Sequence, residues 1–279
     1  MSWEINKAEF RFLEELKQED SAWIGHIDFA YDLVVNTKPR IITELGTHRG
    51  HSLFSFAQAV SDKKLKTKLY GIDSWEGDVQ AGFYGDKILQ QIKNVKNTYY
   101  KGLNINLIQK YFRDAVSDFE DNSIDILHID GLHTYEAVKQ DYNDWLPKVK
   151  KDGIILLHDI AEKKGDFGVY KLWDEIKEKD SGYLEFTHSH GLGVIFLGNS
   201  SKLVTNELLL LRERYYPARS LDITIKGLDS VITNRECHIE ELRGEITRLS
   251  GIASKASKEL ETVHNSRFYK IYRIIRGSK

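Results

Sequence analysis

Short apolar runs alternate, over the first 200 residues, with segments in which apolar residues recur at every third or fourth position. The runs have the length of buried strands, and the segments between them have the periodicity of helices. The strand-like runs read RIITELG, KLYGID, NINLIQKY, SIDILHID and GIILLHD. Because strands that alternate with helices form βαβ units, we expect an α/β fold with a doubly wound, mostly parallel sheet over residues 37–200.

Further elements are predicted at both ends of this sheet. Apolar residues at helical spacing, such as Leu13, Trp23 and Leu33, predict a helical cover over residues 1–36. Near the other end, YLEFTHS and GVIFLG are expected to pair as two strands across the glycines of HGLG. This pair would close the sheet.

A different pattern begins after residue 200. Residues 201–224, which include Pro217, are expected to form a linker, and residues 225–264 repeat apolar residues with a period of seven. The a positions of this repeat are Ile225, Ile232, Ile239, Ile246, Ala253 and Leu260. The d positions are Leu228, Arg235, Leu242, Leu249, Ala256 and Val263. Isoleucine at a with leucine at d favours a parallel two-stranded coiled coil, so we expect a homodimer; a single helix docked on the body is the alternative.

The last segment, residues 265–279, mixes basic and apolar side chains and contains no acid. Its basic residues are Arg267, Lys270, Arg273, Arg276 and Lys279. This composition suits the surface of an anionic membrane, so we expect a basic amphipathic tail in peripheral contact with lipid. The alternative is a helix end that packs on its neighbour.

The net charge of −2 hides an asymmetry, because residues 1–200 carry −7 and residues 201–279 carry +5. An acidic body argues against nucleic acid as a partner. Cys237 is the only cysteine, which excludes an intrachain disulfide framework and fits a reducing compartment. The first residues lack a signal-peptide pattern and no apolar run approaches about 18 residues, so we expect a cytoplasmic protein whose tail reaches the inner face of the membrane.

Polar chemistry follows several of the predicted strands. One strand ends in Asp130-Gly131-Leu132-His133 and another in His158-Asp159. In open α/β sheets ligands bind outside the carboxyl ends of the strands, so these carboxylates and imidazoles are expected to share one cleft.

The first strand runs into ELGTHRGHS, where glycines can turn the backbone tightly at a helix N-terminus. Asp73 ends the second strand, and its carboxylate could accept two hydrogen bonds from a ribose diol. Simple alternatives remain for each acid: Glu44 and Asp114 as helix caps, and Asp73 as an ordinary loop residue.

In this order, ELGTHRGHS, YGIDSWEGD, AGFYG, SIDILHIDGLHTYE, LLHDI, DFGVY and HGLGV resemble class I S-adenosylmethionine-dependent methyltransferases over residues 20–198. The series is similar to the metal-dependent sugar O-methyltransferases of macrolide-sugar and cephalosporin pathways. The resemblance implies a Rossmann-like methyltransferase sheet and S-adenosylmethionine as cofactor. It further implies that Glu44 and Gly46 contact the methionine part and Asp73 the ribose, and that Asp114 lies near the adenine.

The same resemblance implies a metal site. Asp130 and Asp159 would bind a divalent cation, with magnesium the first choice, and His133 would be the general base. His158 stands where these relatives carry an acid. It is a candidate metal ligand, or a residue that orients another ligand of the metal. Imidazole suits zinc, iron or nickel better than magnesium, so the identity of the metal and the need for one stay open. His133 could instead cap the helix that begins near Thr134.

Aromatic residues mark the loop after the second strand. Trp75, Phe83 and Tyr84 are expected to form a substrate loop over the acceptor, with plain packing as the alternative. His190 is a further candidate for the cleft, whereas His128, inside a strand, is expected to be packed.

Together these features predict an O-methyltransferase that acts, with a divalent metal, on a sugar hydroxyl of a glycan, a lipid-linked saccharide or a glycosylated metabolite. A metal-free small-molecule methyltransferase is one alternative. Another is a nucleotide-binding coiled-coil scaffold without turnover. A dehydrogenase is disfavoured because the G-x-G-x-x-G spacing is missing.

Overall fold

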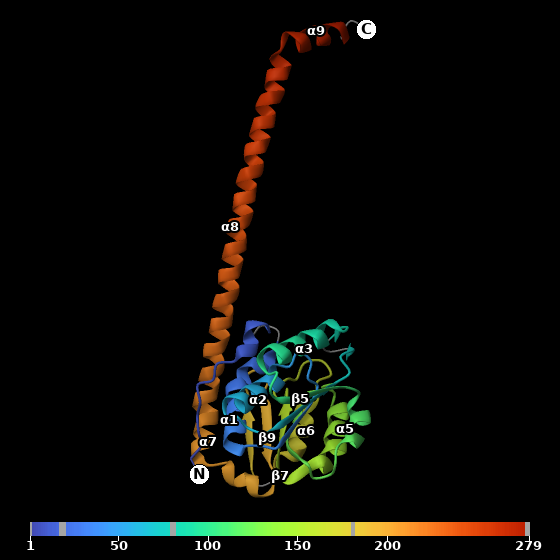
Figure 1. The fold of residues 1–279 in the computed structure, drawn as a ribbon, viewed down its shortest axis with the longest axis vertical. Helices are drawn as coiled ribbons and strands as arrows, with labels where there is room; N and C mark the ends of the chain where they lie inside the picture. The colour runs from blue at the N-terminus through green and yellow to red at the C-terminus, as the bar shows by residue number, and fades with distance from the viewer. Residues whose placement is uncertain (1, 17–20, 79–81, 180–181, 277–279) are drawn as a thin grey trace. The chain divides into compact units, whose positions relative to one another are not determined.

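The computed structural model describes residues 2–16, 21–78, 82–179 and 182–276, and the chain divides into two compact units, Met1–Gly227 and Leu228–Lys279. The first unit is built on a seven-stranded sheet with helices on both faces (Figure 1). Its strands are β1 (Ile41–Leu45), β2 (Lys68–Asp73), β5 (Asn104–Gln109), β6 (Ile124–Ile129), β7 (Val149–His158), β8 (Tyr183–Phe186) and β9 (Leu192–Phe196).

The strands follow the order β5-β2-β1-β6-β7-β9-β8 across the sheet. The first five in this order are parallel, and β9 runs antiparallel to both β7 and β8. The expected strand pair over YLEFTHS and GVIFLG therefore closes one edge of the sheet. This order confirms the prediction of a doubly wound, mostly parallel, Rossmann-like sheet.

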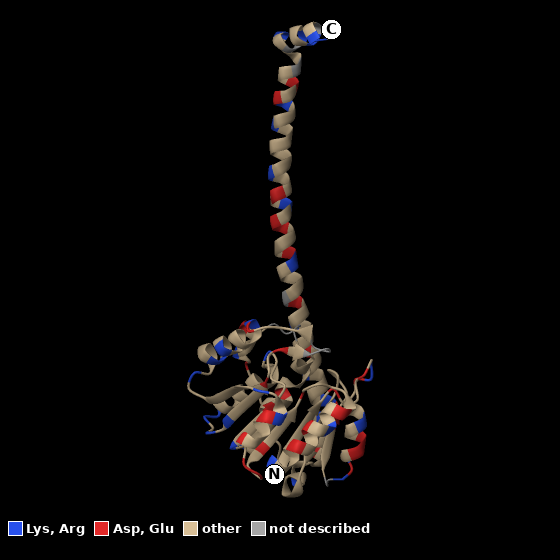
Figure 2. Cartoon of the chain, turned by 90° about the vertical axis from the view of Figure 1, so that its right-hand side faces the viewer, with Lys and Arg blue, Asp and Glu red and all other residues tan. Residues whose placement is uncertain are grey.

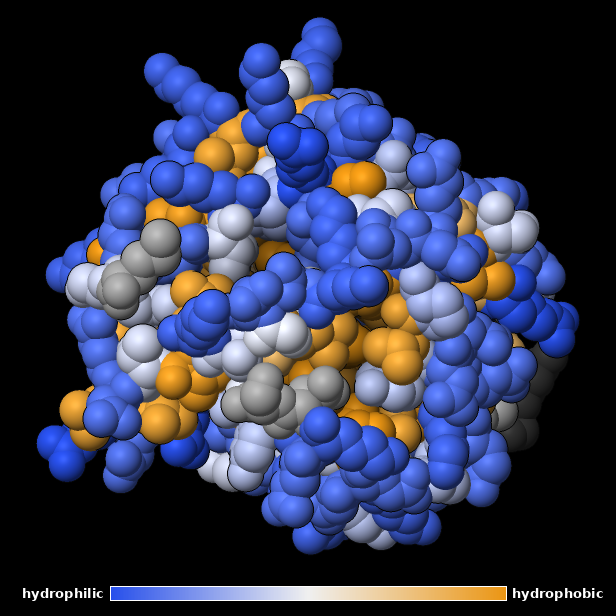
Figure 3. Space-filling model, turned by 90° about the horizontal axis from the view of Figure 1, so that it is seen from below, coloured by the Kyte–Doolittle hydropathy of each residue, from blue (hydrophilic) through white to orange (hydrophobic). Residues whose placement is uncertain are grey.

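Two apolar cores lie on opposite faces of the sheet, because successive side chains of a strand point to opposite sides. Ile126 and Leu156 belong to the core beneath the first helical layer, whereas Leu127 and Ile155 belong to the core beneath the second. The first layer contains α1 (Ile27–Thr37), α2 (His51–Asp62) and α3 (Lys87–Tyr99). The second contains α4 (Phe112–Ala115), α5 (Tyr135–Trp145) and α6 (Val169–Ile176). Seen from below, the surface is mostly hydrophilic, with smaller apolar areas between the polar side chains (Figure 3).

The N-terminal region is less helical than its apolar spacing predicts. Residues 2–10 form no regular element, and helical turns appear at Arg11–Glu14 and Ala22–His26 before α1 begins. Side chains from distant segments hold this stretch instead. Trp3 Nε1 donates to the hydroxyl of Tyr216 at 2.8 Å, and the backbone N–H of Asn6 donates to Asp32 Oδ1 at 3.0 Å. The backbone N–H of Trp3 likewise donates to Glu207 Oε2 at 3.1 Å, so side chains distant in sequence accept backbone hydrogen bonds that a helix would otherwise satisfy.

The predicted linker over residues 201–224 is also a packed, mainly helical segment. It contains the end of a 3-10 turn (Gly198–Leu203), α7 (Asn206–Leu210), a π-helical turn (Leu211–Tyr215) and the start of α8 (Tyr216–Asn265). Leu208, Tyr216 and Ile223 are buried. Pro217 is the second residue of α8 and comes directly after the π-helical turn, and the helical segments continue through it without a break.

The second unit contains the remainder of α8 and α9 (Arg267–Arg276). Acidic and basic residues are interspersed along α8, whereas the charged residues of α9 are all basic (Figure 2). Within the described ranges, no helix combines the length and apolar character that crossing a membrane requires. Residues 277–279, including Lys279 of the predicted tail, lie outside the described residues.

Candidate active site

A cavity of about 730 Å³ lies at the carboxyl ends of the parallel strands. It has the size of a small-molecule site. One lining residue follows or ends each of the five strands: Gly46 after β1, Asp73 on β2, Phe112 after β5, Asp130 after β6 and His158 on β7. The predicted convergence of strand-end residues is therefore present in the structure.

The turn after β1 depends on its two glycines. Gly46 and Gly50 have φ angles of 89° and 82°, a region that L side chains rarely adopt. A Cβ atom at Gly46 would collide with the carbonyl oxygen of Asp130. Gly46 thus allows the close approach of the β1 turn to the residue that follows β6, and Gly50 takes its left-handed conformation at the N-cap of α2.

Asp73 is held with its carboxylate at the cavity. Its Oδ2 accepts a hydrogen bond from the backbone N–H of His48 at 2.8 Å, and its Oδ1 accepts one from the N–H of Trp75 at 2.7 Å. A carboxylate can accept hydrogen bonds from ribose hydroxyls, so its place at the cavity is compatible with the ribose contact, which stays a prediction. The orientation fits the predicted role.

Glu44 lies deeper than predicted. It faces His128 across the β1–β6 register, and its Oε2 lies 2.9 Å from His128 Nδ1, with both side chains fully buried. Burial raises the pKa of Glu44, although His128 opposes this. Its Oε1 has no hydrogen-bond partner among the described residues. Glu44 does not line the cavity, and His128 is packed, as expected, under the ring of Trp23.

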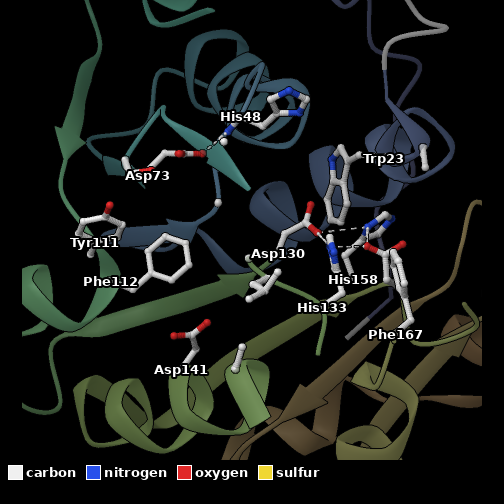
Figure 4. A pocket seen from close by; sticks show the side chains of 18 of the residues that line it. Trp23, His48, Asp73, Tyr111, Phe112, Asp130, His133, Asp141, His158 and Phe167 are labelled. Atoms are coloured by element: carbon white, nitrogen blue, oxygen red, sulfur yellow. Dashed lines mark hydrogen bonds and ion pairs between the residues drawn. The ribbon is translucent and has the colours of Figure 1, made fainter. Parts of the chain in front are cut away.

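Two carboxylates and two imidazoles form a compact cluster at one end of the cavity (Figure 4). His133 Nε2 lies 2.9 Å from Asp159 Oδ2 and 3.4 Å from Asp130 Oδ1. His158 Nδ1 lies 3.1 Å and 3.4 Å from the same two oxygens. The structure therefore brings together the four residues that the strand ends predict.

The opposite charges of this cluster stabilise one another. Burial alone lowers the pKa of both histidines, but the two carboxylates outweigh it and raise each pKa to about 10. Conversely, burial raises the pKa of Asp130 and Asp159, but the histidines outweigh it and hold both carboxyls below their usual range. Each carboxylate therefore favours the protonated form of the histidines beside it, and each histidine favours the ionised form of the carboxyls.

His158 has both ring nitrogens engaged. Nδ1 faces the carboxylates and Nε2 lies 3.1 Å from the carbonyl oxygen of Ser189, so every neighbour is an acceptor and both nitrogens carry protons. Such a residue orients the carboxylates and is poorly placed to ligate a metal.

A different set of donors could hold a metal ion. Asp130, His133 and Asp159 each offer one ligand atom, and these atoms lie within 4.8 Å of one another. Two oxygens and one imidazole nitrogen suit manganese, iron or zinc as well as magnesium. This group contains His133 where the sequence predicts His158 as the third candidate ligand, and both carboxylates are common to the two sets; the ligand set stays a prediction.

Some of the other predicted residues line the cavity and some do not. Tyr84 lines it, and so does His190, whose Nδ1 lies 3.1 Å from Asp159 Oδ1. Trp75 is buried, with its Nε1 donating to the carbonyl oxygen of His48 at 3.0 Å, so it packs beneath the loop and not over an acceptor. Asp114 does not line the cavity; its side chain is 60% exposed beside Arg113.

Three lining residues had no clear signal in the sequence. Trp23 lies before α1, and Phe167 stacks on the ring of His133 with centroids 4.8 Å apart. Asp141 reaches the cavity from the middle of α5. Tertiary packing brings these three side chains to the cavity. Of the three, only Phe167 falls within one of the sequence motifs, DFGVY.

The chain is similar to a methyltransferase family and to two uncharacterized proteins. Residues 43–160 match the model of a family described as a methyltransferase domain. The uncharacterized protein y4gI of Sinorhizobium fredii is 40% identical over 178 residues, which are 64% of this chain and 19% of that protein. The uncharacterized protein R132 of Acanthamoeba polyphaga mimivirus is 35% identical over 127 residues, 43% of this chain and 51% of that protein.

The chain therefore spans about half or less of the curated relatives it matches. Among solved structures, the O-methyltransferase TomG of Streptomyces achromogenes, in complex with SAM, is 12% identical. The match covers 70% of this chain and 92% of TomG, with a TM-score of 0.47. The family match runs from within β1 to just beyond β7, so residues 43–160 are similar to a methyltransferase domain over the strands whose carboxyl ends border the cavity.

Proposed function

We propose that this protein is an S-adenosylmethionine-dependent O-methyltransferase. The observation that carries the proposal is one cavity that joins a fixed carboxylate, Asp73, to the cluster around His133. The first suits the ribose of the cofactor, and the second suits the proton chemistry of an acceptor hydroxyl. When bound, the cofactor supplies an electrophilic methyl group. Gly46 and Asp73 would hold it.

The chain's residues must position the acceptor and take its proton. A hydroxyl oxygen has to lie in line with the methyl group and the departing sulfur, and such positioning lowers the barrier substantially. His133 Nε2 faces two carboxylate oxygens, which favour its protonated form, so it would act as a base only after passing that proton to solvent. Phe167 stacks on its ring and fixes its plane.

We further propose that a divalent cation takes part. Bound by Asp130 and Asp159, it would offset their negative charge, which now holds the proton on His133, and would lower the pKa of the acceptor hydroxyl. A metal-free methyltransferase remains the second candidate, because His158 already places a cation beside both carboxylates.

Chelation separates these two candidates. We expect methyl transfer by the purified protein to stop in EDTA and to return on addition of magnesium or manganese. Binding of S-adenosylhomocysteine, measured by calorimetry, should persist in EDTA because Asp73 is not part of the metal group. Full activity after exhaustive chelation would establish the metal-free enzyme instead.

For the acceptor we propose a sugar hydroxyl of a glycan, a lipid-linked saccharide or a glycosylated metabolite. The cavity carries aromatic and polar side chains together, including Tyr84, Phe167 and His190, a mixture that suits a polar ring. Mass spectrometry of glycans from cells with and without the gene should show the loss of one methyl group. Retention of every methylated glycan, with loss of a methylated non-sugar metabolite, would contradict this acceptor.

We propose that the protein is a homodimer through α8. The isoleucines, leucines and valine at the a and d positions of residues 225–264 are between 46% and 63% exposed in the single chain. A long isolated helix gains little from its own hydrogen bonds in water, so burial of this seam against a second copy would supply the missing stabilisation.

We also propose that α9 lies on the cytoplasmic surface of an anionic membrane. Four exposed apolar residues follow the i, i+3, i+4, i+7 spacing of one helix face: Phe268, Ile271, Tyr272 and Ile275. Four basic residues occupy other positions of the helix, and no acid follows Glu261. A single helix that combines an apolar face with uncompensated positive charge is complementary to anionic lipid.

Vesicle sedimentation tests this contact. The full chain should bind phosphatidylcholine vesicles that contain phosphatidylserine and should bind pure phosphatidylcholine poorly, since each basic residue contributes about 1 kcal/mol near a charged surface. Replacing both Lys270 and Arg273 by glutamate should abolish binding. Lys258→Glu, on the exposed surface of α8, is the matched control and should have little effect. Equal binding of both vesicle types would contradict the proposal.

A further inference from the structure

The turn between β8 and β9 has an unfavourable backbone conformation beside the histidine cluster. Ser189, His190 and Gly191 have φ angles of 50°, 63° and 89°, so three consecutive residues lie in the left-handed region. Serine and histidine rarely adopt this conformation, and it persists only where surrounding contacts hold it. Other parts of the protein must therefore hold this turn in place.

Backbone hydrogen bonds connect the turn to the strand end that carries Asp159. The N–H of Gly191 donates to the carbonyl oxygen of His188 at 2.9 Å, and the N–H of Ala161 donates to that of His190 at 2.8 Å. His190 Nδ1 lies 3.1 Å from Asp159 Oδ1. The position of the turn thus decides where His190 meets the cluster.

Two imidazoles meet at one carbonyl oxygen of this turn. Nε2 of His158 lies 3.1 Å from the carbonyl oxygen of Ser189, and Nε2 of His26 lies 3.3 Å from the same oxygen. The centroids of the two rings are 5.5 Å apart, and the ring planes meet at 80°. Because a carbonyl oxygen has two lone pairs, it can accept from both nitrogens at once. The carbonyl group that fixes Nε2 of His158 is therefore itself held by His26.

His26 lies outside the cavity. It is the last residue of the helical turn Ala22–His26, its side chain is fully buried, and it does not line the cavity. Its Nε2 faces an oxygen that can only accept, so this nitrogen carries a proton. Its Nδ1 has no hydrogen-bond partner among the residues that the structure describes. Within those residues, the ring of His26 thus donates to Ser189 and to nothing else.

We propose that His26 is a positioning residue, whose hydrogen bond to the Ser189 carbonyl holds the left-handed turn and thereby orients His158 and His190 against Asp159. A histidine that only filled space in the core would need no donor at this point. The expected effect on turnover rests on the proposed function, whereas the effect on the turn can be measured without any turnover.

Two substitutions separate the hydrogen bond from packing. His26→Phe keeps a ring and loses the donor, whereas His26→Gln loses the ring and keeps an N–H group at a similar distance from the backbone. His26→Phe should lower kcat about tenfold, the size expected for one hydrogen bond, with unchanged affinity for S-adenosylhomocysteine. His26→Gln should restore kcat. A role in packing alone predicts the reverse order of the two variants.

Amide hydrogen exchange, followed by NMR, measures the turn directly because exchange reports local opening. In His26→Phe the amides of Gly191 and Ala161 should exchange about tenfold faster than in the unmodified protein. In His26→Gln they should exchange at the original rate. The amide of Gly46, which donates to the carbonyl oxygen of Ile72 at 2.9 Å, should exchange equally in all three proteins.

Val34→Ala is the matched control, since Val34 is buried on α1 about two helical turns after His26. This substitution removes core contacts but no hydrogen bond, so kcat and the exchange of the Gly191 amide should stay unchanged. Equal losses in His26→Phe and His26→Gln, or unchanged kcat or exchange in a folded His26→Phe protein, would overturn the role of His26.

The proposed function fails by a different result. An unmodified protein that transfers no methyl group from S-adenosylmethionine would overturn that function, and the exchange of the Gly191 amide would then still decide whether His26 holds the turn.

Discussion

His133 and Asp73 act on different parts of the proposed reaction, although both side chains face one cavity. Asp73 is fixed by two backbone N–H groups of the β1 and β2 turns, whereas His133 is fixed by two carboxylates and the ring of Phe167. Replacing one should therefore leave the environment of the other unchanged. This separation makes their roles distinguishable by experiment.

His133→Ala should lower kcat by about 100-fold or more, the usual contribution of a general base, with little change in the affinity for S-adenosylhomocysteine. Asp73→Asn should show the reverse pattern, with about tenfold weaker cofactor binding. Calorimetry and single-turnover kinetics measure the two effects. Unchanged turnover in His133→Ala would remove His133 from the proton step.

A second titratable residue, Asp32, affects stability and not catalysis. It is fully buried and accepts hydrogen bonds from Asn6 and from the hydroxyl of Tyr216, yet burial raises its pKa to about 7. An unfolded aspartate has a pKa of about 3.9, so the unfolded chain loses this proton first as pH rises. Its contribution to stability is complete below pH 4 and falls as pH rises towards 7.

Asp32→Asn should remove that fall. Between pH 5 and pH 8 the free energy of unfolding of the unmodified protein should drop, relative to the variant, by about 2.5 kcal/mol. Urea denaturation at the two pH values measures this difference. If the free energy of unfolding changed equally with pH in both proteins, the pKa of Asp32 would not be raised in the folded protein.

At the level of elements, the periodicity of apolar residues predicted those strands and helices that neighbouring residues in the sequence determine. The strands, the mostly parallel sheet and the acids and histidines at the strand ends follow from apolar runs and from where these runs stop. The extended N-terminus and the packed 201–224 segment escaped prediction because their partners, such as Asp32 for Asn6 and Phe29 for Tyr216, are far away in the sequence.

Two candidate site residues lie away from the cavity, and one residue that lines it was not predicted, for the same kind of reason. The register of β1 against β6 pairs Glu44 with His128, and the turn after β2 carries Trp75 into the core. Asp141 was missed because the rotation of α5 against the sheet, which is set by packing, decides which of its residues reach the cavity.

At the level of the whole molecule, the proposed dimer can be tested in the full chain. Leu242→Glu with Leu249→Glu places charge at two d positions and should convert a dimer of 32.3 kDa chains into monomers in light scattering. Thr247→Glu, at a b position of the same helix, is the control and should stay dimeric. A monomeric unmodified protein would disprove the dimer directly.

The ten-residue length of α9 has a consequence for how attachment to lipid would be controlled. So short a helix holds a surface weakly, but a parallel pair presents two copies at the same end of the coiled coil, and the second copy then binds at a high effective concentration. Attachment would thus require assembly: newly made single chains would remain in solution, and only paired chains would stay at the membrane. The Leu242→Glu, Leu249→Glu protein, with α9 intact, should therefore fail to sediment with anionic vesicles.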